Sequence, residues 1–134
     1  MTNSELRELF LFTDLTDTQL DWIREHSETF DVGDGEIVVS EGEQARCFYV
    51  LLAGTLQMTR LVAGDPVEIT RTDQRGVYFG ATQFYLGDQV DQTYGASVRT
   101  LSDCRLLALP SRDFNEVFRR WYPMAVHLLS LIHI

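Results

Sequence analysis

The stretch Val38–Gly54 reads VVSEGEQARCFYVLLAG and decides how we interpret the rest of the chain. Two apolar residues come first, a glycine follows at Gly42, and an apolar run then leads to a second glycine, Gly54. Glycines at these places indicate turns with positive φ, a conformation that glycine adopts without steric cost. A near-continuous apolar run between two turns is typical of a strand that is buried on both faces. We therefore predict a central strand over Cys47–Ala53.

Outward from this strand, the middle of the chain has an apolar period of two. Short runs rich in β-branched and aromatic residues alternate with breaks at glycine, aspartate or proline, and Ala63–Pro66 is the clearest hairpin tip. Many short strands at such spacing are typical of a sandwich or a jelly-roll barrel. The eight predicted strands are Thr29–Val32, Glu36–Ser40, Cys47–Ala53, Thr55–Val62, Val67–Thr72, Gly76–Phe79, Thr93–Thr100 and Arg105–Leu109.

Helical patterns flank the strands at both ends. Ser4–Phe12 has an apolar face, and a second helix begins at Thr16, which forms the spacing of a capping box with Gln19. Ser111 can cap a third helix, and Met124–Ile134 is apolar nearly all round. The predicted fold is α+β but mainly β: an eight-stranded antiparallel jelly-roll (double-stranded β-helix) barrel flanked by N-terminal and C-terminal helices.

The domain organisation follows from these patterns. We expect residues 1–134 to form a single domain, with helices over about 4–27, the barrel over about 29–109 and C-terminal helices over about 111–134. A helix as apolar as Met124–Ile134 needs something to cover it. We therefore expect a homodimer through the C-terminal helices, and a chain that is part of a longer signalling protein.

Composition excludes several classes of protein. The chain has 45% hydrophobic and 23% charged residues, which is typical of a globular domain. Its net charge of −9 makes direct nucleic-acid contact by this segment unfavourable. No apolar run approaches the roughly 20 residues of a membrane-spanning helix, so we predict no membrane partner. Cys47 and Cys104 lie in apolar strand patterns and are predicted to be buried thiols of a cytoplasmic protein rather than a disulfide.

A second stretch, Gly76–Thr100, has a pattern suited to binding anions. It reads GVYFGATQFYLGDQVDQTYGASVRT, in the order strand, glycine, short helical turn, polar loop, strand. This order aims several backbone N–H groups at one point, and such a point attracts anions because those N–H groups are unpaired. We therefore interpret Gly76–Thr100 as a phosphate-binding cassette or a variant of one.

Taken together, the element order and both stretches resemble the cyclic-nucleotide-binding domain family, which includes the catabolite activator and the protein kinase A regulatory subunit. The likeness covers about Leu11 to Leu129, and Val38–Gly54 is similar to the family's first signature throughout. The resemblance implies a regulatory sensor domain in signal transduction that takes a small-molecule or nucleotide ligand. It implies no catalytic residues and no cofactor.

The cassette departs from the family pattern at the two positions that hold the ligand. Ligand-binding members begin the cassette with Phe-Gly-Glu, whose glutamate binds the ribose, and end it with an arginine that pairs with the cyclic phosphate. Here Ala81 follows Phe79 and Gly80, and Tyr94 aligns with the arginine. Strand alternation places Arg99 on the other face from Tyr94. The resemblance, with this departure, implies weak or absent binding of cyclic AMP and cyclic GMP.

The candidate ligand-binding residues follow from the cassette. They are Phe79, Gly80, Ala81, Thr82, Gln83, Phe84, Thr93, Tyr94, Gly95, Ala96 and Ser97. The aromatic residues Tyr94, Phe84 and Tyr85 either line an apolar pocket for a different ligand or fill the vacated site. Because protein interiors are packed to high density, filling is the favoured interpretation.

A metal enzyme is disfavoured by the positions of the histidines. Cupins share the jelly-roll shape, but their metal ligands include several strand histidines, whereas His26, His127 and His133 all lie in predicted helices. No nucleophile–base pair with local support is present either. We therefore predict no metal site and no enzymatic activity for this segment.

Three hypotheses remain for what the domain controls. Trp121–Leu129 and Arg71–Tyr78 resemble the N-terminal heads of certain bacterial sensor histidine kinases, with a kinase domain downstream. The first alternative is the regulatory half of a catabolite-activator-type transcription regulator. The second is a ligand-independent dimerisation or docking scaffold.

Overall fold

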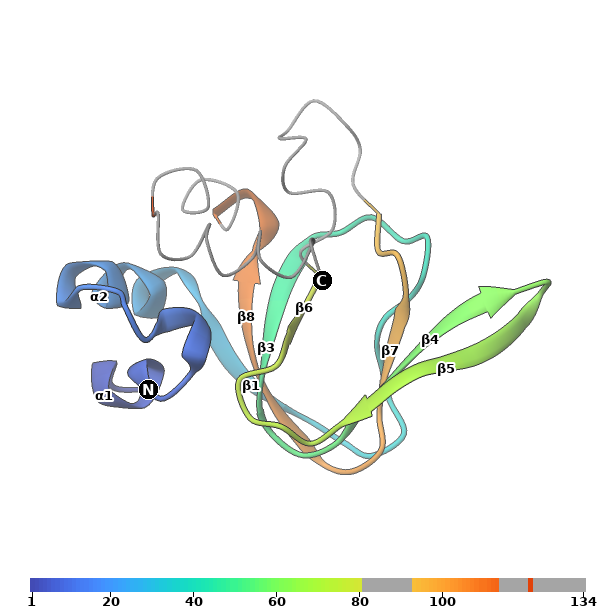
Figure 1. Cartoon of the computed structure of the whole chain (residues 1–134). Helices are drawn as coiled ribbons and strands as arrows, with labels where there is room; N and C mark the ends of the chain where they lie inside the picture. Colours follow the sequence, from blue (N-terminus) through green and yellow to red (C-terminus); the bar gives the residue numbers. More distant parts are fainter. Residues whose placement is uncertain (81–92, 114–120, 122–134) are drawn as a thin grey trace.

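The chain is mainly β with a helical N-terminus (Figure 1). The computed structural model describes residues 1–80, 93–113 and 121. The helical elements are α1 (Asn3–Arg7), the 3-10 helix η1 (Phe10–Phe12) and α2 (Asp17–His26). The strands are β1 (Glu28–Val32), β2 (Ile37–Val39), β3 (Cys47–Ala53), β4 (Leu56–Val62), β5 (Asp65–Thr72), β6 (Tyr78–Phe79), β7 (Ser97–Thr100) and β8 (Cys104–Pro110).

The strands form two antiparallel sheets that face each other. One sheet has the order β1-β8-β3-β6 and the other has the order β2-β7-β4-β5. Neither sheet closes on itself within the described residues, so the mainly β, antiparallel prediction is confirmed but the closed barrel is not what we observe. Each sheet instead ends in two strands that have one partner, β1 and β6 in the first and β2 and β5 in the second. The chain passes from one sheet to the other at tight turns, including those at Gly35 (φ 80°) and Gly54 (φ 100°).

Gly54 shows why one of these turns requires glycine. A Cβ atom at this position would lie 2.5 Å from the Sγ atom of Cys104 and 2.6 Å from the carbonyl oxygen of Asp103. The β3–β4 turn therefore packs directly against the start of β8, and only a residue without a side chain allows this approach.

Two apolar layers hold the sheets and helices together. The first lies between the N-terminal helices and the outer face of the β1-β8-β3-β6 sheet, and includes Leu6, Phe12, Phe48 and Val50. The second lies between the two sheets, in the space we call the roll interior; its members are Val39, Leu51, Leu56, Phe79, Tyr94, Val98, Cys104 and Leu106. Strand β3 contributes to both layers and is buried on both faces, as its apolar run predicts.

The helix predicted over Ser4–Phe12 is in fact two short helices. Helix α1 ends at Arg7, Leu9 adopts an extended conformation (ψ 119°), and η1 follows. Leu6, Leu9 and Phe12, on both sides of this break, all belong to the first apolar layer. The predicted capping box is confirmed: the Thr16 hydroxyl accepts from the Gln19 N–H, and the Gln19 side chain accepts from the Thr16 N–H.

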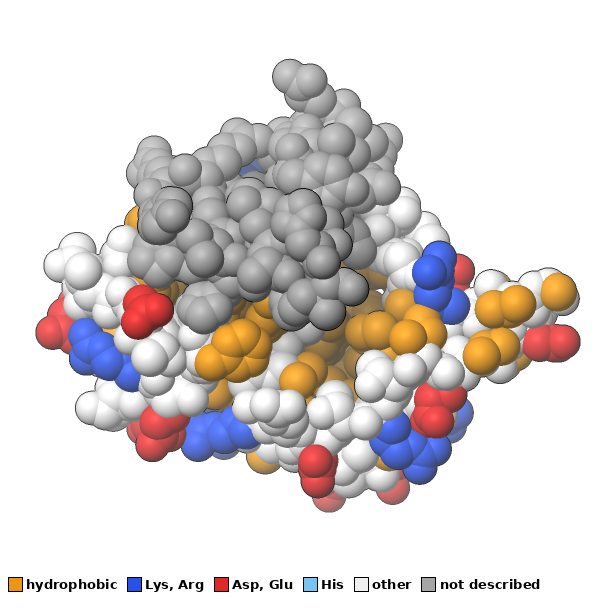
Figure 2. Space-filling model, in the orientation of Figure 1, with side chains coloured by type: hydrophobic (Ala, Val, Ile, Leu, Met, Phe, Trp, Pro, Cys, Tyr) orange, Lys and Arg blue, Asp and Glu red, His pale blue; other side chains and the backbone are white. Residues whose placement is uncertain are grey.

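The β4–β5 hairpin projects from the body (Figure 1). Strand β4 pairs with β7 only over Leu56–Thr59, and beyond that point β5 is its only partner among the described strands. The tip predicted over Ala63–Pro66 is shorter than expected: Ala63 and Gly64 form it, both with positive φ, and Asp65 and Pro66 belong to β5. Figure 2 shows hydrophobic side chains at the surface of this projecting hairpin. The exposed large hydrophobic residues of the hairpin are Leu61, Val62, Val67 and Ile69.

Several predicted boundaries need correction. Strand β7 begins at Ser97 rather than Thr93, because the backbone of residues 93–94 pairs with the loop before β3 instead of with a full strand. Cys104 is buried as predicted, but Cys47 is only half-buried because it starts β3 at the edge of the roll. Beyond the helical residues 111–113, the predicted C-terminal helices lie outside the described residues except for Trp121, which packs edge-to-face on Trp22.

Candidate functional site

Three chain segments meet at the position where the cassette is predicted. They are the end of β6, the start of β3 and the segment around Tyr94. At Gly80 (φ 91°) a Cβ atom would lie 2.8 Å from the Cys47 carbonyl oxygen and 3.3 Å from a ring carbon of Tyr94. The glycine that follows Phe79 thus allows β6, β3 and the Tyr94 ring to come into contact.

Tyr94 fills this junction. Its side chain is 6% exposed and belongs to the apolar layer of the roll interior. The Tyr94 hydroxyl donates to the Cys47 carbonyl oxygen at 2.9 Å and accepts from the Cys47 N–H at 3.2 Å. Its backbone is also tied, because its N–H donates to the Glu43 carbonyl and its carbonyl accepts from the Gly42 N–H, both at 2.9 Å. Tyr94 is therefore a structural bridge between the cassette and the loop that precedes β3.

Tyr94 cannot supply the charge that an arginine would bring here. Burial raises the pKa of the Tyr94 phenol, so the hydroxyl stays protonated and neutral at ordinary pH. Burial likewise raises the pKa of its neighbour Tyr49, whose ring stacks on Phe79 with centroids 5.1 Å apart. Neither phenol therefore brings a positive charge to the junction, and the Tyr94 hydroxyl is already hydrogen-bonded to Cys47.

Three arginines near the cassette in the sequence, Arg71, Arg75 and Arg99, do not pair with Tyr94. Arg99 is exposed on β7, on the opposite face from the buried Val98. Arg71 pairs with Glu68 at 2.9 Å on the exposed hairpin, and Arg75 pairs with Glu8 at 3.1 Å near the N-terminal helices.

The structure brings together only part of the predicted site. Phe79, Gly80, Tyr94, Gly95 and Ala96 line one cavity of about 250 Å³ in the roll interior. Other described residues around it, such as Val39, Met58 and Val98, make this cavity strongly apolar.

The remaining predicted residues lie elsewhere. The Ser97 hydroxyl accepts from the Glu41 N–H at 2.9 Å, so it stabilises the turn before β3. Thr93 is exposed and forms an isolated bridge with Gln44. Ala81, Thr82, Gln83 and Phe84 lie outside the described residues.

Sequence reasoning missed Arg46. This residue lines a second cavity of about 450 Å³, which shares Val39 and Tyr94 with the first and is also lined by Val38, Gln44 and Tyr49. Its position in an exposed loop gives no sign of a site in the sequence. The one available signal is that Arg46 directly precedes the strand that the cassette packs on.

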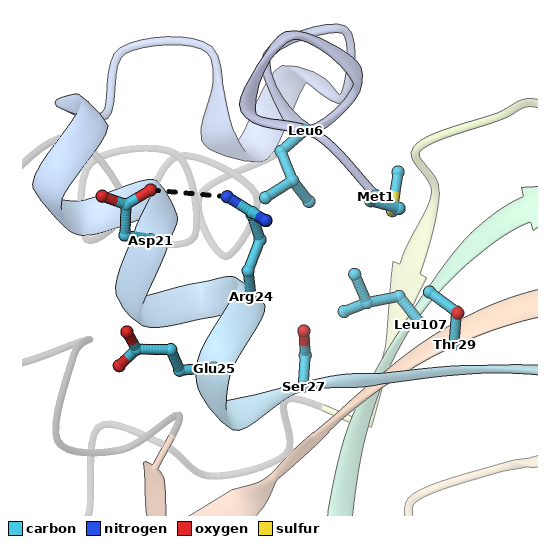
Figure 3. Close-up of a pocket in the computed structure, with 8 residues that line it drawn as sticks. All are labelled: Met1, Leu6, Asp21, Arg24, Glu25, Ser27, Thr29 and Leu107. Carbon is cyan, nitrogen blue, oxygen red and sulfur yellow. Dashed lines mark ion pairs between the residues drawn. The ribbon is translucent and has the colours of Figure 1, made fainter.

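A third cavity, of about 530 Å³, lies near the N-terminal helices, far along the chain from the cassette (Figure 3). Leu6 of α1 and Met1, which precedes α1, line one side of this cavity. Asp21 and Arg24 of α2 line another part of it. Arg24 pairs with Asp21 at 3.6 Å, so the cavity's basic side chain already has an acidic partner.

The described residues contain neither a candidate metal-binding group nor a candidate membrane-spanning helix. No group of three or more His, Cys, Asp or Glu side chains is placed to hold a metal ion in the part of the chain that the structure describes. Among the same residues, no helix is both long and apolar enough to span a bilayer.

Comparison with known proteins identifies the family. The family model described as "Cyclic nucleotide-binding domain" matches residues 30–120, and the chain belongs to this family. The sensor domain of the transcriptional regulator DNR from Pseudomonas aeruginosa has the same fold, with a TM-score of 0.80 and 22% identity over 98% of this chain and 85% of that chain.

Other solved structures are similar over a smaller part of their length. The regulatory subunit of a cAMP-independent protein kinase A from Trypanosoma brucei has a TM-score of 0.83 and 16% identity, over 98% of this chain and 46% of that chain. The Thermus thermophilus catabolite activator protein has a TM-score of 0.74 and 21% identity, over 92% of this chain and 56% of that chain. The chain thus spans about half of these two proteins, which share its fold.

Proposed function

We propose that this domain is a regulatory sensor module whose cassette does not bind cyclic AMP or cyclic GMP at signalling concentrations. The observation that supports this most is the state of Tyr94. At the position of the family's phosphate-binding arginine, the chain has a neutral, buried phenol whose hydrogen bonds are made to Cys47. The second anchor is also absent, because Ala81 stands where ligand-binding members have glutamate.

Energetics give the size of the effect. A hydrogen bond to a charged group contributes about 1.5–3 kcal/mol, so the loss of two such anchors weakens binding by roughly two to four decades.

We further propose that the signal leaves the domain through the chain that follows β8. The support for this is that Trp121 contacts Trp22 of α2 edge-to-face, with ring centroids 5.4 Å apart. A downstream histidine kinase domain, a transcription-regulator domain and dimerisation through the C-terminal helices all remain predictions of the sequence.

The first prediction tests the absence of cyclic-nucleotide binding by calorimetry on the 134-residue chain. We expect no saturable heat with cyclic AMP or cyclic GMP up to the low micromolar range. A double variant, Ala81→Glu with Tyr94→Arg, restores both anchors and should gain roughly two to four decades of affinity.

The matched control combines Ala81→Glu with Thr93→Arg, which adds the same charge one position earlier, on an exposed residue. This control restores the ribose anchor alone, so it should gain only about half of that increase, roughly one to two decades. Saturable binding by the unmodified chain would contradict the proposal whatever the variants do, and thermal melts of both variants show whether they are folded.

A further inference from the structure

The cavity beside Arg46 has the size and the lining of a ligand site. Its volume of about 450 Å³ falls within the range of small-molecule pockets in proteins. Val38 and Val39 form an apolar wall, and Tyr49 provides an aromatic surface. The Tyr49 ring is held in place by stacking on Phe79 and by an edge contact with Phe30 at 6.2 Å.

Arg46 is the basic side chain among the described residues that line this cavity. It makes no ion pair in the described part of the chain, a property that it shares with Arg60, Arg99, Arg105 and Arg112, whereas Arg7, Arg24, Arg71 and Arg75 have acidic partners within 4.0 Å. A guanidinium group offers five N–H donors and no acceptor, so it suits a carboxylate, sulfonate or phosphate.

The acidic residue that lines the same cavity does not neutralise Arg46. Glu43 is exposed, and no ion pair joins its carboxylate to Arg46. Glu43 contributes to the fold through its backbone carbonyl, which accepts from the Tyr94 N–H.

The backbone around Arg46 is fixed on both sides. Its own carbonyl accepts from the Ser111 N–H at 2.9 Å, at the end of β8. The next residue, Cys47, has both its N–H and its carbonyl bound to the Tyr94 hydroxyl. A cation on an anchored backbone needs less ordering to bind a ligand than one on a loose loop.

We propose that this cavity binds a small organic anion, whose negative group pairs with Arg46 and whose apolar body packs against Tyr49, Val38 and Val39. The site shares Val39 and Tyr94 with the apolar cavity of the cassette, and its cation is Arg46 rather than a residue at the position of the family's arginine. The inference goes beyond the proposed function, because it requires only Arg46 and the cavity, and not the absence of cyclic-nucleotide binding.

The test compares a charged probe with a neutral probe of nearly the same shape. Anilinonaphthalene sulfonate is an aromatic anion, phenylnaphthylamine is its neutral counterpart, and both fluoresce on transfer to an apolar site. We expect the substitution Arg46→Gln to weaken binding of the sulfonate by roughly ten- to a hundredfold, the equivalent of one charge-assisted hydrogen bond. Binding of the neutral probe should stay the same.

The control is Arg99→Gln, which makes the same change of charge on an exposed strand residue that lies outside the cavity lining. It should change neither dissociation constant by more than about twofold, since surface charges act weakly at this range in salt. The proposal is overturned if the sulfonate does not bind, if both variants weaken it equally, or if Arg46→Gln weakens both probes equally.

Cyclic AMP is titrated in parallel, so that the two proposals fail separately. Cyclic AMP binding that survives Arg46→Gln would contradict the proposed function and leave the anion site standing. A sulfonate affinity that does not depend on Arg46 would overturn the anion site alone.

Discussion

Two tyrosines that differ in their hydrogen bonds allow a matched test at the scale of single residues. The Tyr94 hydroxyl bridges the N–H and the carbonyl of Cys47, whereas the buried hydroxyl of Tyr78 has no hydrogen-bond partner among the described residues. We expect Tyr94→Phe to lower the free energy of unfolding by about 1–3 kcal/mol, because two backbone groups lose their partner.

Tyr78→Phe removes an unpaired hydroxyl, so it should leave stability within about 0.5 kcal/mol or raise it slightly. Urea denaturation of both variants measures the difference. Equal losses in the two would mean that the Tyr94 bridge does not stabilise the junction.

Among the elements, the turns that join the two sheets make the sharpest prediction. Gly35 and Gly54 both have positive φ, but a Cβ atom at Gly35 would meet nothing within 4 Å, whereas at Gly54 it would collide with Asp103 and Cys104. Gly35→Ala should therefore cost only the conformational strain, about 1–2 kcal/mol. Gly54→Ala adds overpacking against backbone, so we expect a loss of about 2–5 kcal/mol.

Thermal and urea unfolding of the two alanine variants gives the comparison. A smaller loss for Gly54→Ala than for Gly35→Ala would show that the start of β8 can move away from the turn.

For the molecule as a whole, buried phenols predict a loss of stability in alkali. Burial raises the pKa of Tyr49, Tyr78 and Tyr94 above the ordinary value of 10.0. The contribution of these phenols to the free energy of unfolding is complete below pH 10.0 and declines as the pH rises above it. The reason is that the unfolded chain then releases protons that the folded chain still holds.

Urea midpoints between about pH 8 and about pH 11 should therefore be level at first and then fall, while phenolate absorbance develops late in the folded protein. Tyr78→Phe should weaken this dependence without lowering stability at neutral pH. A level profile across the whole range would contradict the burial of these phenols.

How far the sequence predicts the molecule depends on the range of the interactions involved. The strand over Cys47–Ala53, the capping box at Thr16 and the hairpin tip at Ala63 follow from local patterns, and the structure confirms them. The break at Leu9 does not follow, because it arises from packing of the N-terminal helices on the sheet.

The same distinction holds for the candidate site. Alignment to the cassette places Tyr94 beside Gly80, and the structure brings the two into contact. Neither the bridge from Tyr94 to Cys47 nor the cavity beside Arg46 has a sequence signature, since both depend on how distant segments meet.

The pairing of β1 with β8 has a consequence for how the protein is made. Glu28 at the start of β1 pairs with Ala108 near the end of β8, so nearly the whole roll separates the two partners in the sequence. A ribosome releases the chain from its N-terminus, and β1 must wait with its hydrogen-bonding groups unpaired until β8 has been synthesised. Strands that are so far apart in the sequence also pair slowly during folding, because a long loop must close first. The nascent chain is therefore most exposed to aggregation just before Cys104–Pro110 emerges.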